Sequence, residues 1–210
     1  MMPTSTAMLS RRARPLPRDA RRAALISATL PLIRKHGIDV STRQIATAAG
    51  VAEGTIFRVF PDKDSLIQAT VDAAFDPAPV VAALGRIDRS APLPERLTAV
   101  VHIVQAWLTT VINLMMVLRG SSPLGHKPHL RRPRPSDVIG ATITRLIEPD
   151  RAQLRMPPAR AERLLRLMLF AGSHPGIADG KLLTAEEIVN VILDGVRIHG
   201  SASDRGRTPC

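Results

Sequence analysis

Polar side chains that can contact nucleic acid follow one another closely between Ser41 and Phe60. Arg58, Thr55 and Glu53 all come shortly after a glycine, Gly50. Side chains of these types make the hydrogen bonds by which proteins recognise DNA phosphates and base edges. The chemistry favoured here is therefore recognition through hydrogen bonds, without a covalent step.

The small and apolar residues of the same stretch predict the helix-turn-helix that would position these groups. Ala46 is small enough for two short helices to touch, Gly50 permits the tight turn, and Ile45, Val51 and Ile56 form a miniature core. This packing frees the outer face of the second helix for a major groove. The residues on that face are Glu53, Gly54, Thr55 and Arg58. An ordinary helical hairpin is the alternative.

Local signals place the neighbouring helices. Ser41 and Gln44 form a capping box, which predicts a helix start, and Gly50 ends that helix. A preceding helix is expected over 21–36, closed by Gly37 and disturbed by Pro31. Further helices are expected over 51–59 and from Lys63 to about residue 75.

The remaining sequence also predicts helices, so the expected fold class is all-α. A short helix reaches residue 87, and others span 93–118, 136–147, 159–172 and 185–199. The last begins at a second capping box, Thr184 to Glu187, and ends at Gly200. Residues 120–135 read as a loop rich in proline, glycine and basic residues. No strand pattern of useful length occurs.

Composition narrows the function classes. The 210 residues carry 29 Lys and Arg against 18 Asp and Glu, a net charge of +11, which suits a protein that meets polyanions. Aromatic residues make up only 2%, so Leu, Ile, Val, Ala and Met must build the core, which favours helices. The single cysteine, Cys210, and the scattered histidines offer no disulfide, catalytic or metal-binding arrangement. We expect no enzyme, cofactor or metal, and a cytoplasmic, nucleoid-associated location.

The sequence resembles the TetR family of bacterial regulators over about residues 25–66. The resemblance rests on Ile45-Ala46, Ala49-Gly50-Val51, Gly54-Thr55-Ile56-Phe57 and Phe60-Pro61-Asp62-Lys63-Asp64-Ser65-Leu66. It implies an N-terminal DNA-binding domain of three helices and a larger helical domain that binds a small ligand and forms a homodimer. It also implies repression that is relieved when ligand changes the spacing of the two DNA-binding domains.

The family's DNA contacts transfer to particular residues. The resemblance implies phosphate contacts at Thr42, Thr55 and Lys63, the last aided by a helix N-terminus. It implies base reading by Arg43, whose fork could bind a guanine; a solvated charge is the alternative. Arg58 is equally suited to a phosphate or a base.

Two positions depart from the family pattern. Phe57 stands where a tyrosine hydroxyl usually meets phosphate, and Val59 stands where histidine is common. The resemblance therefore implies the loss of one polar DNA contact. Phe57 is kept as a candidate DNA-binding residue through packing against a sugar, although a place in the core is the favoured expectation.

A row of polar residues along the helix expected over 93–118 suggests a ligand pocket. Polar groups inside an apolar helix need partners, which can be neighbouring helices, water or a ligand. The family architecture implies a pocket beside this helix. The candidate ligand-binding residues are His102, Gln105, Trp107, Thr109, Asn113 and Met116.

Two C-terminal helices carry apolar ridges suited to dimerisation. Paired across a twofold axis, they would form a four-helix bundle. The candidate interface residues are Leu164, Leu167, Met168, Ala171, Ile188, Val191, Ile192 and Gly195. These ridges could instead seal the core of their own subunit.

The expected organisation is a basic arm over 1–17, a DNA-binding domain over 18–66, a ligand-binding and dimerisation domain over 67–200, and a tail over 201–210.

Two alternatives to a ligand-responsive regulator remain. Residues 97–118 contain no Asp, Glu, Lys or Arg and are long enough to cross a membrane, although the polar row favours a buried helix. A membrane-anchored sensor and a non-specific architectural DNA-binding protein therefore stay open. The effector, the operator and the direction of regulation are not specified by the sequence.

Overall fold

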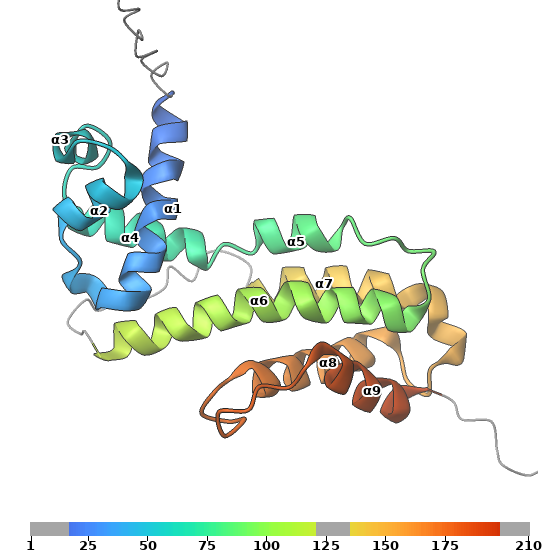
Figure 1. The fold of residues 1–210 in the computed structure, drawn as a ribbon. Coiled ribbons are helices and arrows are strands. Elements are labelled where there is room, and N and C mark those ends of the chain that lie inside the picture. The colour runs from blue at the N-terminus through green and yellow to red at the C-terminus, as the bar shows by residue number, and fades with distance from the viewer. Residues whose placement is uncertain (1–16, 121–134, 198–210) are drawn as a thin grey trace, which may run out of the picture. The chain divides into compact units, whose positions relative to one another are not determined.

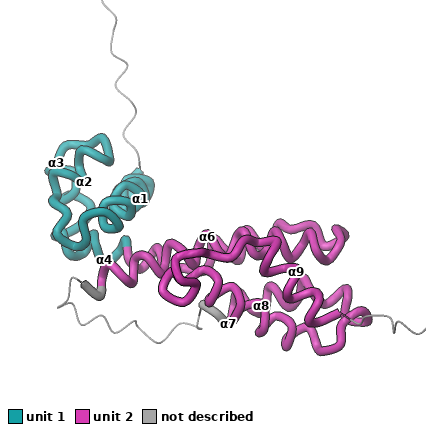
Figure 2. The backbone as a smooth tube through the Cα atoms, turned by 60° about the horizontal axis from the view of Figure 1, so that its bottom comes forward, with its two compact units in different colours: residues 1–70 teal, residues 71–210 magenta. Residues whose placement is uncertain are grey.

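The computed structural model describes residues 17–120 and 135–197. All the regular elements in these ranges are helices, besides one isolated bridge between Leu154 and Arg197 (Figure 1). The chain divides into two compact units, residues 1–70 and 71–210 (Figure 2). The division falls within helix α4, close to the expected domain boundary after residue 66. The expected basic arm and C-terminal tail lie outside the described residues, apart from Pro17.

The N-terminal unit is built on α1, Arg18–His36, which is followed by the 3-10 turn η1, Gly37–Asp39. Helices α2, Thr42–Ala49, and α3, Glu53–Phe57, come next, and α4, Lys63–Ala74, begins in this unit. Pro31 lies inside α1 without ending it. The fully buried side chains of the unit include Leu25, Ile33, Ile45, Ile56, Phe60 and Leu66.

The connection between α2 and α3 has the geometry that the helix-turn-helix needs. The capping box is present: the Ser41 hydroxyl accepts from the Gln44 amide, and the Gln44 side chain accepts from the Ser41 amide. Gly50 ends α2 in the left-handed conformation, with φ 65° and ψ 32°. The turn closes when the Val51 amide donates to the Ala46 carbonyl at 3.0 Å. The predicted cap and glycine turn are confirmed, whereas α3 is shorter than the expected 51–59.

The C-terminal unit packs its helices around α6, Leu93–Gly120. The other elements are α5, Ala78–Leu84; α7, Pro135–Ile147; the 3-10 turn η2, Glu148–Gln153; α8, Pro158–Ser173; and α9, Ala185–Val196. Leu97, Val101, Ile143, Leu165 and Ile188 are among the residues of its apolar core. The capping box from Thr184 to Glu187 is confirmed at the start of α9.

The end of α9 differs from the expectation. The helix stops at Val196, and Arg197 is extended, so a helix to residue 199 is wrong. Arg155 supplies the reason, because its amide donates to the Val196 carbonyl at 2.8 Å and its guanidinium donates to the Gly195 carbonyl. A distant segment, rather than a glycine cap, satisfies the last carbonyls of α9. Gly200 and the expected loop, apart from its end residues, lie outside the described residues.

Helix α6 is apolar and long, yet it is the central packing element of the C-terminal unit. An 18-residue window within Leu93–Leu118 has a mean hydropathy of 1.7, and the helix is long enough to cross a membrane. One such helix is weak evidence of a span. Leu97, Val100, Val101 and Val104 all belong to the core shared with α7, α8 and α9. These residues make α6 a core helix as expected, although 33% of its apolar window is buried within the chain.

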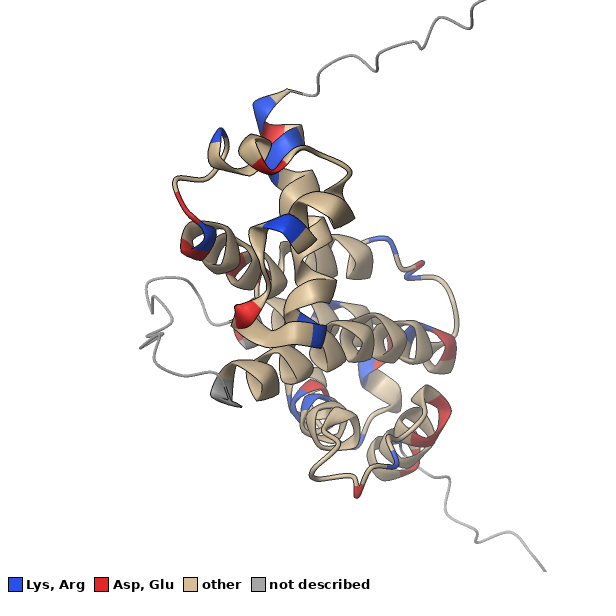
Figure 3. Ribbon diagram, turned by 60° about the vertical axis from the view of Figure 1, so that its left-hand side comes forward, with Lys and Arg blue, Asp and Glu red and all other residues tan. Residues whose placement is uncertain are grey.

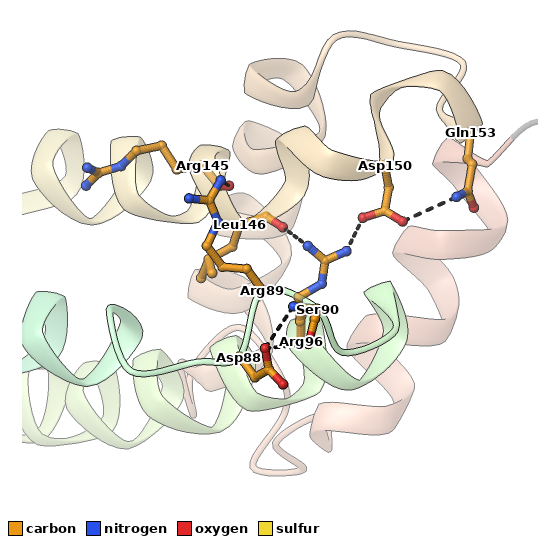
Figure 4. Close-up of polar contacts among 8 residues, drawn as sticks. All are labelled: Asp88, Arg89, Ser90, Arg96, Arg145, Leu146, Asp150 and Gln153. Carbon is orange, nitrogen blue, oxygen red and sulfur yellow. Dashed lines mark hydrogen bonds and ion pairs between the residues drawn. The ribbon is translucent and has the colours of Figure 1, made fainter.

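A buried arginine joins the start of α6 to the end of α7 (Figure 4). Arg96 is 2% exposed and forms an ion pair with Asp150 of η2. Its guanidinium also donates to the carbonyl of Leu146 in α7. Asp150 accepts in addition from the Gln153 side chain at 3.3 Å. Paired and hydrogen bonded in this way, a buried charge can be tolerated.

Candidate nucleic-acid interface

Among the residues that the structure describes, the excess of positive over negative charge lies in the N-terminal unit. Residues 17–70 contain eight Lys and Arg against five Asp and Glu, whereas residues 71–120 and 135–197 contain twelve of each. Figure 3 shows the two signs interspersed along the helices rather than gathered in one block. The unit that carries the helix-turn-helix is thus the described part best suited electrostatically to a polyanion.

The face of α2 and α3 presents most of the predicted DNA contacts to solvent. Arg43, Glu53, Gly54 and Arg58 are exposed, whereas Thr42 and Thr55 are half-buried. This exposure follows from the packing, because Ile45 and Ile56 turn the opposite faces of the two helices into the core. The side chains of Arg43, Glu53 and Arg58 are consequently open to solvent on this face.

A hydrogen bond connects the first residues of the two helices. The Thr42 hydroxyl donates to the carboxylate of Glu53. Thr42 begins α2 and Glu53 begins α3, so the bond bridges the turn made by Gly50. Sequence reasoning named both residues as DNA contacts but did not predict their interaction.

Lys63 stands at the N-terminus of α4, directly after an aspartate that caps the helix. The Asp62 carboxylate accepts from the Ser65 amide at 2.7 Å. Hydrogen bonds from the Ser65 side chain and backbone lower the pKa of Asp62. Lys63 is half-buried. A helix N-terminus and an ammonium group together favour an anion, which is the arrangement expected of a phosphate contact.

Phe57 and Val59, the two residues that depart from the family pattern, differ in how far they are buried. Phe57 is 50% exposed, so the expectation that it serves the core is wrong. Phe60 fills the core instead at 1% exposure, and the Arg22 guanidinium lies over its ring at 4.4 Å from the centroid. Val59 is buried. Phe57 is therefore an exposed apolar group at the end of α3.

Residues 25–70 match the family model for the bacterial regulatory proteins of the TetR family. This match covers the capping box, the glycine turn, α3 and the start of α4. The N-terminal unit is a TetR-family domain.

Solved structures of TetR-family regulators share the fold of the larger part of the chain. A regulator from Streptomyces coelicolor, SCO0520, is 22% identical with a TM-score of 0.58, covering 85% of this chain and 99% of its own. A putative TetR-family regulator from Mesorhizobium loti is 17% identical with a TM-score of 0.58, covering 88% and 100%. NalD from Pseudomonas aeruginosa, the secondary repressor of the MexAB-OprM multidrug efflux pump, is 22% identical with a TM-score of 0.54, covering 86% and 98%. The all-α fold with an N-terminal helix-turn-helix is thus the TetR-regulator fold.

Several of the predicted ligand-binding side chains hydrogen bond within the chain. Gln105 donates to the Leu183 carbonyl at 2.7 Å, Thr109 donates to the Gln105 carbonyl at 2.8 Å, and the Trp107 indole donates to the Ala74 carbonyl at 3.1 Å. The predicted polar row is therefore satisfied in part by neighbouring segments, one of the alternatives that the sequence left open.

The six ligand candidates do not converge on one point. His102 has a side chain 63% exposed, with its Nε2 3.9 Å from Glu186, and Met116 is 44% exposed. These two residues are about 20 Å apart along α6. Asn113 is half-buried between them. Of the six candidates, the half-buried ones are Gln105, Trp107, Thr109 and Asn113.

The candidate dimer residues divide by burial. Leu164, Leu167 and Val191 are exposed apolar side chains, Gly195 is exposed, and Met168 and Ala171 are half-buried. Ile188 and Ile192 lie in the core of their own unit and are not available to a partner. Phe170, which the sequence analysis did not name, is a further exposed apolar side chain on α8, at 44%. Its spacing of three residues from Leu167 on the same helix was the available signal.

Proposed function

We propose that the protein is a transcriptional regulator that binds a specific duplex site as a homodimer. The exposed polar face of α2 and α3 beside a buried miniature core carries the proposal. A face of this kind is what a helix-turn-helix inserts into the major groove. The positive surplus of the same unit supports attraction to the phosphate backbone.

Within this proposal the exposed groups have separate tasks. Lys63 and Thr55 contact phosphates and fix the position of the unit on the duplex. Arg43 reads a base edge, and Arg58 contacts either a base or a phosphate. Phe57 adds apolar contact. DNA occupancy then controls access to a neighbouring promoter.

Selection of bound fragments from the host's genomic DNA tests the specific regulator. Enrichment of a pseudo-palindromic site, retained against an excess of random duplex, is the expected result. Equal binding to random duplex would instead favour the architectural alternative. Recovery of the protein without detergent would exclude the membrane-anchored alternative.

Lys63→Ala tests the phosphate contact on the enriched site. The variant should weaken binding evenly across sequences and flatten the slope of log affinity against log salt by about one. Lys35→Ala is the matched control, because Lys35 is an exposed cation in the last turn of α1, which is not one of the helices of the proposed face. Equal slopes for wild type and Lys63→Ala would remove Lys63 from the interface.

The homodimer is proposed to use the exposed apolar side chains of α8 and α9. In the single chain, four large apolar side chains of these helices are exposed to water: Leu164, Leu167, Phe170 and Val191. A partner subunit would cover them. Leu167→Asp should shift the mass in solution from dimer to monomer. Ile177→Asp is the control, because Ile177 is similarly exposed at 54% but lies between α8 and α9. A dimer that survives Leu167→Asp would place the interface elsewhere.

A small-molecule effector is proposed to bind beside α6 and to relieve repression. The half-buried side chains from Gln105 to Asn113 line this part of the helix. Trp107 bonds to the carbonyl of Ala74 at the end of α4, the helix that starts at Lys63. Linkage requires that DNA weaken effector binding by the same factor by which effector weakens DNA binding. Screening compounds for release of the enriched fragment tests this proposal. Compounds that bind beside α6 and leave the affinity for DNA unchanged would contradict it.

A further inference from the structure

The hydrogen bond between Thr42 and Glu53 bears on how the proposed DNA-binding face reads sequence. A threonine hydroxyl carries a single hydrogen, and a phosphate oxygen can only accept. Thr42 donates that hydrogen to Glu53. Thr42 therefore cannot donate to a phosphate while this bond is in place, which differs from the role that the family resemblance implies.

An exposed carboxylate on a surface that meets phosphates needs a compensating donor. Glu53 is exposed at the first residue of α3, where like charge on the DNA backbone would repel it. In the major groove the base-edge donors are the N4 amino group of cytosine and the N6 amino group of adenine. Adenine places the N7 acceptor next to its amino group, and guanine and thymine present acceptors that repel a carboxylate. Cytosine is the base that a carboxylate matches.

We propose that Glu53 is a specificity-determining residue that selects cytosine at one position of each half-site, and that Thr42 is the positioning residue that orients its carboxylate. The inference rests on the proposed function and adds the base that this residue reads. Gly54 follows Glu53, and a Cβ built on Gly54 would meet nothing within 4 Å. The chain's own packing therefore leaves the helix surface open at the residue that follows Glu53, so a base pair can approach α3 there.

Selection of binding sites from a random duplex library, with wild type and variants, tests the assignment. Wild type should enrich a palindrome with one position fixed as cytosine in each half. Glu53→Gln should move that position toward adenine, because a glutamine amide pairs with the N6 and N7 atoms of adenine. The cytosine site should then bind about tenfold more weakly to Glu53→Gln than to wild type. Asp64→Asn is the control, since Asp64 is an exposed carboxylate in the first turn of α4.

The variants Thr42→Val and Thr42→Ser test whether Thr42 orients the Glu53 carboxylate or contacts a phosphate. Valine keeps the shape without the hydroxyl, so Thr42→Val should lose the preference for cytosine and keep the affinity for random duplex. Thr42→Ser should restore the preference. An even loss of affinity for all duplexes in Thr42→Val, with base preference intact, would overturn the positioning role.

The outcomes distinguish this inference from the proposed function. A palindrome enriched by wild type and unchanged in Glu53→Gln would refute the cytosine assignment and leave the regulator standing. Failure of wild type to enrich any sequence would refute both. Circular dichroism melts should match for wild type and the Glu53 and Thr42 variants, because the bond lies at the surface.

Discussion

Removing either partner of the Arg96–Asp150 ion pair should destabilise the C-terminal unit, by different amounts for the two partners. Arg96 is 2% exposed, so Asp150→Ala leaves a buried cation that keeps a hydrogen bond to the Leu146 carbonyl and a weaker attraction to Asp88. Breaking a buried pair in this way costs about 3–5 kcal/mol. In Arg96→Met the orphaned carboxylate is 16% exposed and keeps the Gln153 amide. The cost then falls to about 1–3 kcal/mol, the usual penalty for an unsatisfied polar group.

Urea unfolding followed by tryptophan fluorescence measures this difference directly. Trp107 is the single tryptophan of the sequence and lies in the C-terminal unit, so its fluorescence reports on the unfolding of that unit. Arg151→Met is the control, because Arg151 and Glu148 form a pair with side chains 70% and 49% exposed. That variant should cost less than about 0.5 kcal/mol. A larger loss in Arg96→Met than in Asp150→Ala would refute the reasoning from burial.

Three further predictions concern the N-terminal unit. Gly50→Ala should lower the free energy of unfolding by about 1 kcal/mol, because alanine disfavours the left-handed φ of 65°. A Cβ at this position would meet no atom, so steric overlap does not contribute. Unchanged stability in chemical denaturation would contradict this prediction. Gly54→Ala should instead raise helix stability by about 0.5–1 kcal/mol while weakening duplex binding, and tighter binding would argue against close approach of DNA at that residue. The lowered pKa of Asp62 means that its ionised form contributes stability above pH 3.8 that is lost as the pH falls through the lowered value. The difference in melting temperature between wild type and Asp62→Asn should therefore shrink on acidification below that pH, and a constant difference would exclude the carboxylate as its cause.

The features that the sequence predicted well are those set by neighbouring residues. The Ser41 and Thr184 capping boxes and the glycine turn at Gly50 need only contacts within a few residues, so their spacing in the sequence is sufficient. The apolar spacing along the long helix likewise anticipated α6 as a core element.

The features that the sequence did not predict depend on contacts between distant segments. Phe57 and Phe60 are close neighbours in the same apolar pattern, and packing against the other helices decides that Phe60 is buried. The end of α9 is determined by Arg155, and the pairing of Arg96 with Asp150 joins residues 54 positions apart. The Thr42–Glu53 bond exists because the two helix starts meet across the turn, which requires the folded helix-turn-helix.

Footprinting of the purified protein on a genomic fragment that it selects is the most direct test of DNA recognition by α3. A dimeric helix-turn-helix protein should protect two half-sites with centres about 34–36 Å apart, or a multiple of that distance. Arg58→Ala should weaken both protected segments together. Uniform coverage of the fragment, or no protection at low salt, would contradict the account.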